Sequence, residues 1–163
     1  MYVSIRDCML PASGIPDPLD ALRELGLSAL ELAVSKDGEV NSVTKEDGSP
    51  FVLTDSGDRA ELSDKLRSED ASICGFLMAN DFSSDDFEGE VSALTDVARA
   101  AQRMDVPVVR VDLLPHQGDM EMGPFADRCV EALRRAMTET DSVELGIENH
   151  GTTSNRPEFM DRI

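Results

Sequence analysis

The sequence is poor in several residue types, and each shortage excludes a class of protein. Its three cysteines, Cys8, Cys74 and Cys129, are odd in number and have no CxxC spacing, so neither a disulfide framework nor a zinc knuckle is expected. No apolar run has the length of a membrane span, and the start, MYVSIRDC, lacks the basic region and apolar core of a signal peptide. We therefore expect reduced thiols and a cytoplasmic location.

Lysine is scarce as well, since only Lys36, Lys45 and Lys65 occur. The chain has 33 acidic residues against 15 basic ones and a formal charge of −18. The field of such a surface repels polyanions, so nucleic acid is not an expected partner. At 163 residues, with 40% hydrophobic residues, the chain is too apolar for a disordered acidic tail, and we expect a single domain over residues 1–163.

Short apolar segments alternate along the chain with segments of helical period. The predicted strands begin at Tyr2, Ala29, Ser72, Pro107 and Val143. Helices are predicted over 17–27, with Asp17 as N-cap, and over 58–68, 88–104 and 123–137. The gap at 35–57 contains two Asp-Gly pairs, which favour a loop with a small hairpin. This alternation predicts an α/β fold with about five parallel strands and right-handed crossovers.

Charged residues share one face of several predicted strands. Side chains alternate across a strand, so the apolar set of each strand can pack on helices while the opposite set faces a common interior. The opposite set contains Arg6, Glu31, Arg110, Asp112, Glu148 and His150. This pattern is typical of a barrel with a polar site at the carboxyl ends of its strands. A buried salt-bridge network of Arg6, Glu31, Arg110 and Asp112 is the alternative interpretation.

The segment GIENHG, followed by TTSNRPEF, resembles the fifth strand and following loop of the xylose isomerase-like TIM barrels. This superfamily contains sugar phosphate isomerases and epimerases and also endonuclease IV. The resemblance extends back through YVSIRD, LGLSALELAV and VPVVRVDLL. It covers the whole chain, but only the first five of the family's eight strand-helix units, so we expect a partial (β/α)8 barrel.

The resemblance implies a metal-dependent isomerase or epimerase of a sugar or sugar phosphate. It implies a divalent metal (Mn, Mg, Co or Zn) at the barrel mouth, with Glu148 as metal ligand and proton carrier. Glu31 and His150 are implied as further catalytic residues, and Asn149 lines the same mouth. Arg110 and His116 are candidates for substrate binding.

The same residues allow three interpretations of the chain, and they also predict self-association. The chain is expected to be an incomplete portion of a barrel, inactive alone and a weak metal binder, because one carboxylate and one or two histidines are not an octahedral ligand set. A non-catalytic pseudoenzyme is the second interpretation. Endonuclease IV-like DNA repair ranks lowest, because the chain is acidic. Exposed edges of the first and fifth strands would favour a homo-oligomer.

Overall fold

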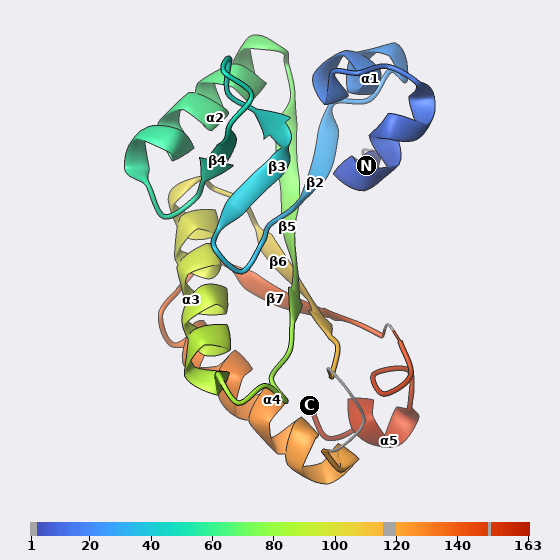
Figure 1. Ribbon diagram of the computed structural model, residues 1–163, viewed down its shortest axis with the longest axis vertical. Coiled ribbons are helices and arrows are strands. Elements are labelled where there is room, and N and C mark those ends of the chain that lie inside the picture. Colours follow the sequence, from blue (N-terminus) through green and yellow to red (C-terminus); the bar gives the residue numbers. More distant parts are fainter. Residues whose placement is uncertain (1–2, 116–119, 150) are drawn as a thin grey trace.

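The computed structural model describes residues 3–115, 120–149 and 151–163 of the chain. Its main sheet has five parallel strands in the order β1-β2-β5-β6-β7. Figure 1 shows helices α2, α3 and α4 on one side of this sheet, with α1 and α5 towards opposite ends of the molecule. The sheet does not close, since β1 and β7 form its two outer edges. The predicted alternating α/β fold is confirmed.

All five predicted strands form, and the hairpin forms in the predicted gap. The bounds of the sheet strands are β1 Ser4–Arg6, β2 Ala29–Ala33, β5 Ser72–Asn80, β6 Val108–Leu113 and β7 Glu144–Glu148. The hairpin pairs β3, Glu39–Thr44, with β4, Pro50–Val52, in an antiparallel two-stranded sheet. A bridge between Val34 and Val40 joins the hairpin to the end of β2.

Helices α1, α2 and α3 begin at aspartates, which satisfy free amides of the first turn. Asp17 accepts from the amides of Leu19 and Asp20, as the predicted N-cap of its helix. Asp55 and Asp86 cap the next two long helices in the same way. The bounds of the helices are α1 Pro18–Glu24, α2 Ser56–Ser68, α3 Phe87–Arg103, α4 Met122–Met137 and α5 Pro157–Met160.

The core lies between the sheet and the helices. One face of the strands is apolar and completely buried, through Leu30, Leu32, Phe76, Met78, Val109, Val111 and Leu113. The apolar stripes of α3 and α4 cover this face with small and branched side chains. Phe159 of α5 stacks on Phe125 of α4, with ring centroids 5.5 Å apart, and fixes the end of the chain on the core. The opposite face of the sheet is therefore the one that carries the polar groups.

A short 3-10 helix, η1, follows β1 over Asp7–Ser13 and was not predicted from the sequence. It is fixed by Asp7, whose carboxylate accepts from the amides of Cys8 and Ala33 and from the hydroxyl of Ser42. The side chain thus joins η1, β2 and β3, and it is buried. Within the described part of the chain, no helix has the length and apolar character needed to cross a membrane.

Candidate functional site

The polar face of the sheet brings charged side chains from four strands together. Register pairs Arg6 with Glu31, and Asp112 with Glu148. Arg110 lies opposite Leu77 on one side and Gly146 on the other. Because residues in register on neighbouring parallel strands point to the same face, the alternation predicted from the sequence places these charges in one cluster.

Arg110 is the centre of this cluster, with a carboxylate at each of three guanidinium nitrogens. Nη1 lies 3.0 Å from Glu31 Oε2, and Nη2 lies 2.9 Å from Glu148 Oε2. Nε lies 3.4 Å from Asp112 Oδ1. The side chain of Asp112 is 7% exposed and that of Glu148 is 37% exposed, so the cluster runs from the interior of the protein to the solvent.

Two glycines lie on the polar face of the strands on either side of β6. Gly75 lies opposite Glu31 on β5, and Gly146 lies opposite Arg110 on β7. A Cβ at Gly75 would meet Cγ1 of Val108 at 3.0 Å, whereas a Cβ at Gly146 would lie 3.5 Å from the nearest atom of Val108. Leu77, opposite Arg110 on β5, shares this face.

The electrostatics of the cluster are dominated by burial. Burial raises the pKa of Glu31 above its ordinary value of 4.5, and the negative charges of Glu148 and Asp112 raise it further. The guanidinium groups of Arg110 and Arg6 oppose this rise in the pKa. Three carboxylates face two guanidinium groups here, so a protonated Glu31 would neutralise the cluster. A carboxyl group that holds its proton closer to neutral pH is suited to acid-base work.

The structure places the sequence-predicted site residues in two groups. Glu31, Arg110 and Glu148 lie together in the cluster. Asn149 is exposed, and its Nδ2 donates to Oδ1 of Asn155 at 3.2 Å in the loop after β7. His116 and His150 lie outside the described residues, so their roles stay predictions.

The sequence interpretation included Asp112 in a salt-bridge network but missed that Glu148 belongs to the same network. It gave the carboxylate of Glu148 the role of a metal ligand. The charges of the other four residues were assigned to ion pairs: Arg6, Glu31, Arg110 and Asp112. The pairing of Asp112 with Glu148 in the sheet register connects them. The alternation along β7, which places Glu148 on the face that also carries Arg110 and Asp112, was the available indication.

The arrangement of donors does not fit a divalent metal as it stands. Across residues 3–115, 120–149 and 151–163, no group of three or more His, Cys, Asp or Glu side chains converges in a way that could hold an ion. Each of the three carboxylates instead turns an oxygen towards a different nitrogen of Arg110. A divalent ion requires several oxygens converging on one point at about 2.0–2.6 Å. We therefore derive no chemical step through a metal.

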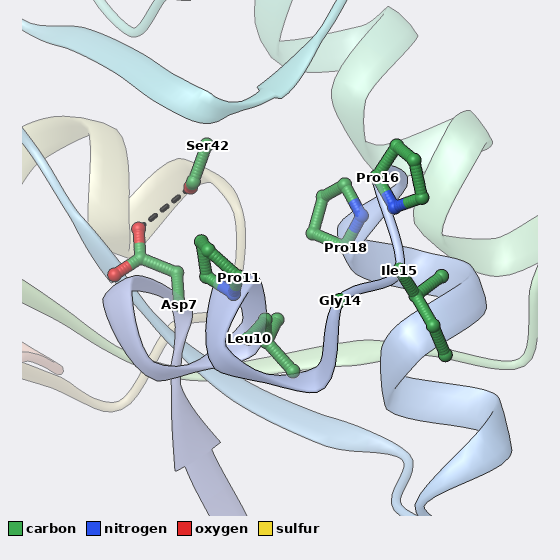
Figure 2. Close-up of a pocket in the computed structure, with 8 residues that line it drawn as sticks. All are labelled: Asp7, Leu10, Pro11, Gly14, Ile15, Pro16, Pro18 and Ser42. Atoms are coloured by element: carbon green, nitrogen blue, oxygen red, sulfur yellow. Dashed lines mark hydrogen bonds between the residues drawn. The ribbon is translucent and has the colours of Figure 1, made fainter.

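A separate pocket lies between η1, the segment that leads into α1, and β3. Figure 2 shows its lining, with Asp7 and Ser42 on one side and Pro16, Pro18 and Ile15 on the other. Its volume is about 260 Å³. The hydrogen bonds of Asp7 to η1, β2 and β3 make its carboxylate a structural element of this wall.

Comparison with known proteins supports the fold and identifies solved structures that are similar to it. No protein-family model matches the chain, and no curated protein matches its sequence. The structure is similar to a sugar phosphate isomerase/epimerase from Parabacteroides distasonis, with a TM-score of 0.66 at 12% identity, over 98% of this chain and 60% of that one. It is also similar to a xylose isomerase domain protein from Planctomyces limnophilus, with a TM-score of 0.62 at 9% identity, over 98% and 59% of the two chains.

A third similar structure is a xylose isomerase-like TIM barrel protein from Mycobacterium smegmatis in complex with magnesium. Its TM-score is 0.59 at 16% identity, over 98% of this chain and 60% of that chain. The class defined by these matches is the TIM barrel, of which the present chain forms an open portion. More particularly, two of these structures are described as xylose isomerase or xylose isomerase-like proteins, the family that GIENHG resembles, and the chain spans about 60% of the length of the three structures.

Proposed function

We propose that the chain is a portion of an isomerase or epimerase that acts on a small sugar or sugar phosphate by proton transfer next to a carbonyl. The observation that carries the proposal is the cluster in which Glu31 and Glu148 meet the same arginine on the polar face of the sheet. Glu148 is the last residue of β7, and α/β barrels bind substrates at the carboxyl ends of their strands. The fold shared with sugar isomerases and epimerases supports the same class of reaction.

The chemistry needs one group that takes a proton and a route for its return. In the proposed reaction the carboxylate of Glu148, 37% exposed, removes the proton from the carbon next to the carbonyl, and the electron pair moves to the carbonyl oxygen to form an enediolate. Return of the proton to the other face of the same carbon gives the epimer. Return to the neighbouring carbon, with a second proton shift between the oxygens, gives the isomer.

Arg110 and Glu31 have supporting roles in this proposal. Arg110 is 2.9 Å from Glu148 and fixes the direction of its carboxylate, while it also neutralises part of the charge that accumulates there. Glu31, with its raised pKa, is the group of the cluster that most readily carries a proton to a substrate oxygen. A divalent metal at Glu148, as the sequence resemblance implies, would polarise the carbonyl, but the described residues alone do not hold one.

The contact between Arg110 and Glu148 also favours the second candidate, a barrel portion without turnover. A carboxylate that is permanently paired with a guanidinium is a weaker base than a free one. In that case the cluster stabilises the sheet, and the fold binds a sugar or a partner without reaction. The two candidates differ in whether the proton of the substrate exchanges with solvent.

Solvent exchange tests the proposed function directly. Small ketoses and their phosphates would be incubated with the protein in D₂O. We expect deuterium at the carbon next to the carbonyl, detected by NMR, and a loss of at least about a hundredfold in Glu148→Gln. Exchange that is equal in wild type and Glu148→Gln would contradict the proposal, and no exchange in either would favour the candidate without turnover.

A further inference from the structure

We infer that the guanidinium of Arg110 is the cation that balances the charges of Glu31, Asp112 and Glu148. A divalent metal can then bind the carboxylate of Glu148 only by displacing Arg110 from it. The inference rests on the proposed function only in the choice of a divalent metal as the competing ion. Its test measures cation binding and no turnover, so that its failure and the failure of the proposed function are distinguishable.

The three carboxylates lie at different nitrogens of the guanidinium of Arg110. Nη1 donates a hydrogen bond to Glu31 Oε2 at 3.0 Å. Glu148 Oε2, 2.9 Å from Nη2, and Asp112 Oδ1, 3.4 Å from Nε, are ion-pair contacts. The three carboxylates therefore surround an ion of guanidinium size and are kept apart by it. A metal ion needs its oxygens at about 2.0–2.6 Å, so the carboxylates would have to move inwards, into the space of the guanidinium.

Charge and burial make the presence of some cation necessary. Asp112 is 7% exposed and Glu31 is 19% exposed, so solvent screens their charges poorly. The only cationic side chain that the structure places within 4.0 Å of any of these three carboxylates, among the described residues, is Arg110. If Arg110 is replaced by a neutral side chain, Arg6 is the remaining guanidinium that opposes the charge of Glu31, and the repulsion among the three carboxylates favours binding of a divalent ion.

Competition between Arg110 and a metal for Glu148 would also affect a complete barrel. A metal that gains oxygens from elsewhere would draw Glu148 from Arg110, and the guanidinium would keep Glu31 and Asp112 as partners. The binding of the two cations is then linked, because any change that strengthens the contact between Arg110 and Glu148 weakens metal binding by the same free energy. Arg110 thereby sets how tightly this site binds a metal.

The test is a Mn²⁺ titration of the 163-residue chain, followed by the EPR signal of the free ion at fixed ionic strength. We expect weak binding by wild type that changes by less than about twofold in Glu148→Gln, because Arg110 holds this carboxylate. Arg110→Gln should bind one Mn²⁺ at least about tenfold more tightly, because a competing charge has been removed. The gain should disappear in the double variant Arg110→Gln/Glu148→Gln.

The matched control is Arg99→Gln, which removes the same charge from an exposed arginine paired with Asp96 and Glu139. It reports any gain that comes merely from a more negative surface, and we expect no new site. A gain in Arg110→Gln no larger than that in Arg99→Gln would overturn the inference. One tight Mn²⁺ site in wild type that Glu148→Gln abolishes would overturn it as well.

A second measurement keeps the inference testable if Arg110→Gln does not fold. The Nε–Hε NMR signal of Arg110 in wild type reports its contact with the carboxylates. Weak binding that does not use Glu148 should leave this signal unchanged. A higher Mg²⁺ concentration that brings Glu148 to the metal should shift the signal, and this shift should vanish in Glu148→Gln. Saturation of a site that requires Glu148 with no change in the Arg110 signal would show that both cations bind together, contrary to the inference.

Discussion

Arg110 on β6 donates a hydrogen bond to Glu31 on β2 across an intervening strand, with Nη1 3.0 Å from Oε2. Strand β5 separates the two residues in the sheet, and its Gly75 lies opposite Glu31. With the contact of Arg110 to Glu148, one side chain connects β2, β6 and β7 on the polar face. Several measurable properties of the protein depend on this connection.

The first prediction concerns the free energy of unfolding of Arg110→Gln. Removal of one partner from a buried ion pair leaves uncompensated charge, and with allowance for the partial exposure of Glu148 we expect a loss of about 2 kcal/mol at neutral pH. Urea denaturation measures it. Arg99→Gln, whose ion pairs are exposed, should change the free energy of unfolding by less than about 0.5 kcal/mol. Equal effects of the two substitutions would show that the cluster has no stabilising role.

The second prediction concerns the pH dependence of stability at Glu31. Because burial raises its pKa in the folded protein above 4.5, Glu31 contributes stability that is present below its unfolded pKa and lost as the pH rises through the folded pKa. The stability of wild type relative to Glu31→Gln should therefore fall as the pH is raised from about 4 to about 7. Denaturation curves at several pH values measure this difference.

Glu88 provides the control of opposite sign. The hydrogen bond from Arg135 lowers the pKa of Glu88, so its contribution is present above the unfolded pKa and is lost as the pH falls through the folded pKa. The stability of wild type relative to Glu88→Gln should thus fall on acidification. The same pH trend for both substitutions would contradict the assignment of the Glu31 shift to burial.

The third prediction compares the stability of alanine variants at the two glycines of the polar face, Gly75 and Gly146. In Gly75→Ala the new methyl group would lie 3.0 Å from Cγ1 of Val108 and 3.4 Å from its carbonyl oxygen, so the Val108 side chain must move slightly, at a cost of about 1 kcal/mol. In Gly146→Ala the nearest atom lies at 3.5 Å, which is an ordinary contact. Thermal unfolding should rank Gly75→Ala clearly below Gly146→Ala, and the reverse order would show that the packing around Val108 differs.

The fourth prediction concerns the thiols. Burial raises the pKa of Cys129 to about 12, whereas Cys8 is exposed. A thiol reagent attacks the thiolate, so at about pH 8 it should label Cys8 quickly and leave Cys129 unlabelled until the protein is unfolded. Mass spectrometry of the labelled peptides, with Cys74→Ser in the background, gives both rates. Labelling of native Cys129 at the rate of Cys8 would show that α4 opens readily.

The fifth prediction concerns self-association. Strands β1 and β7 end the sheet, and a strand at an edge presents unpaired amides and carbonyls to a second chain. We expect a homo-oligomer by light scattering, dissociated by Ile147→Pro, since proline removes an amide from β7. A monodisperse monomer at all concentrations would contradict this expectation.

The fold was predictable from the sequence because its periodicities are strong. Branched apolar runs fixed the five strands, and Asp17 together with Pro18 marked the start of α1. The 3-10 helix η1 could not be foreseen, because it depends on the carboxylate of Asp7 reaching an amide of β2 and a hydroxyl of β3. Contacts between distant segments of this kind leave no local pattern in the chain.

The candidate site was predictable in membership but not in arrangement. Alternation placed Glu31, Arg110, Asp112 and Glu148 on one face, and that face is confirmed by the register of the strands. Which carboxylate meets which nitrogen of Arg110 depends on the register and on the side-chain conformation of Arg110, neither of which the alternation specifies. The catalytic and substrate-binding roles of these residues remain predictions.

The hydrogen bond from Arg110 to Glu31 joins residues 79 positions apart in the chain. Because the contact joins β2 and β6 across β5, we expect it to form late in folding, after the main barrier. Interactions that form late affect the rate of unfolding far more than the rate of folding. We therefore expect the polar cluster to slow unfolding. Loss of the cluster should raise the unfolding rate and leave the folding rate unchanged.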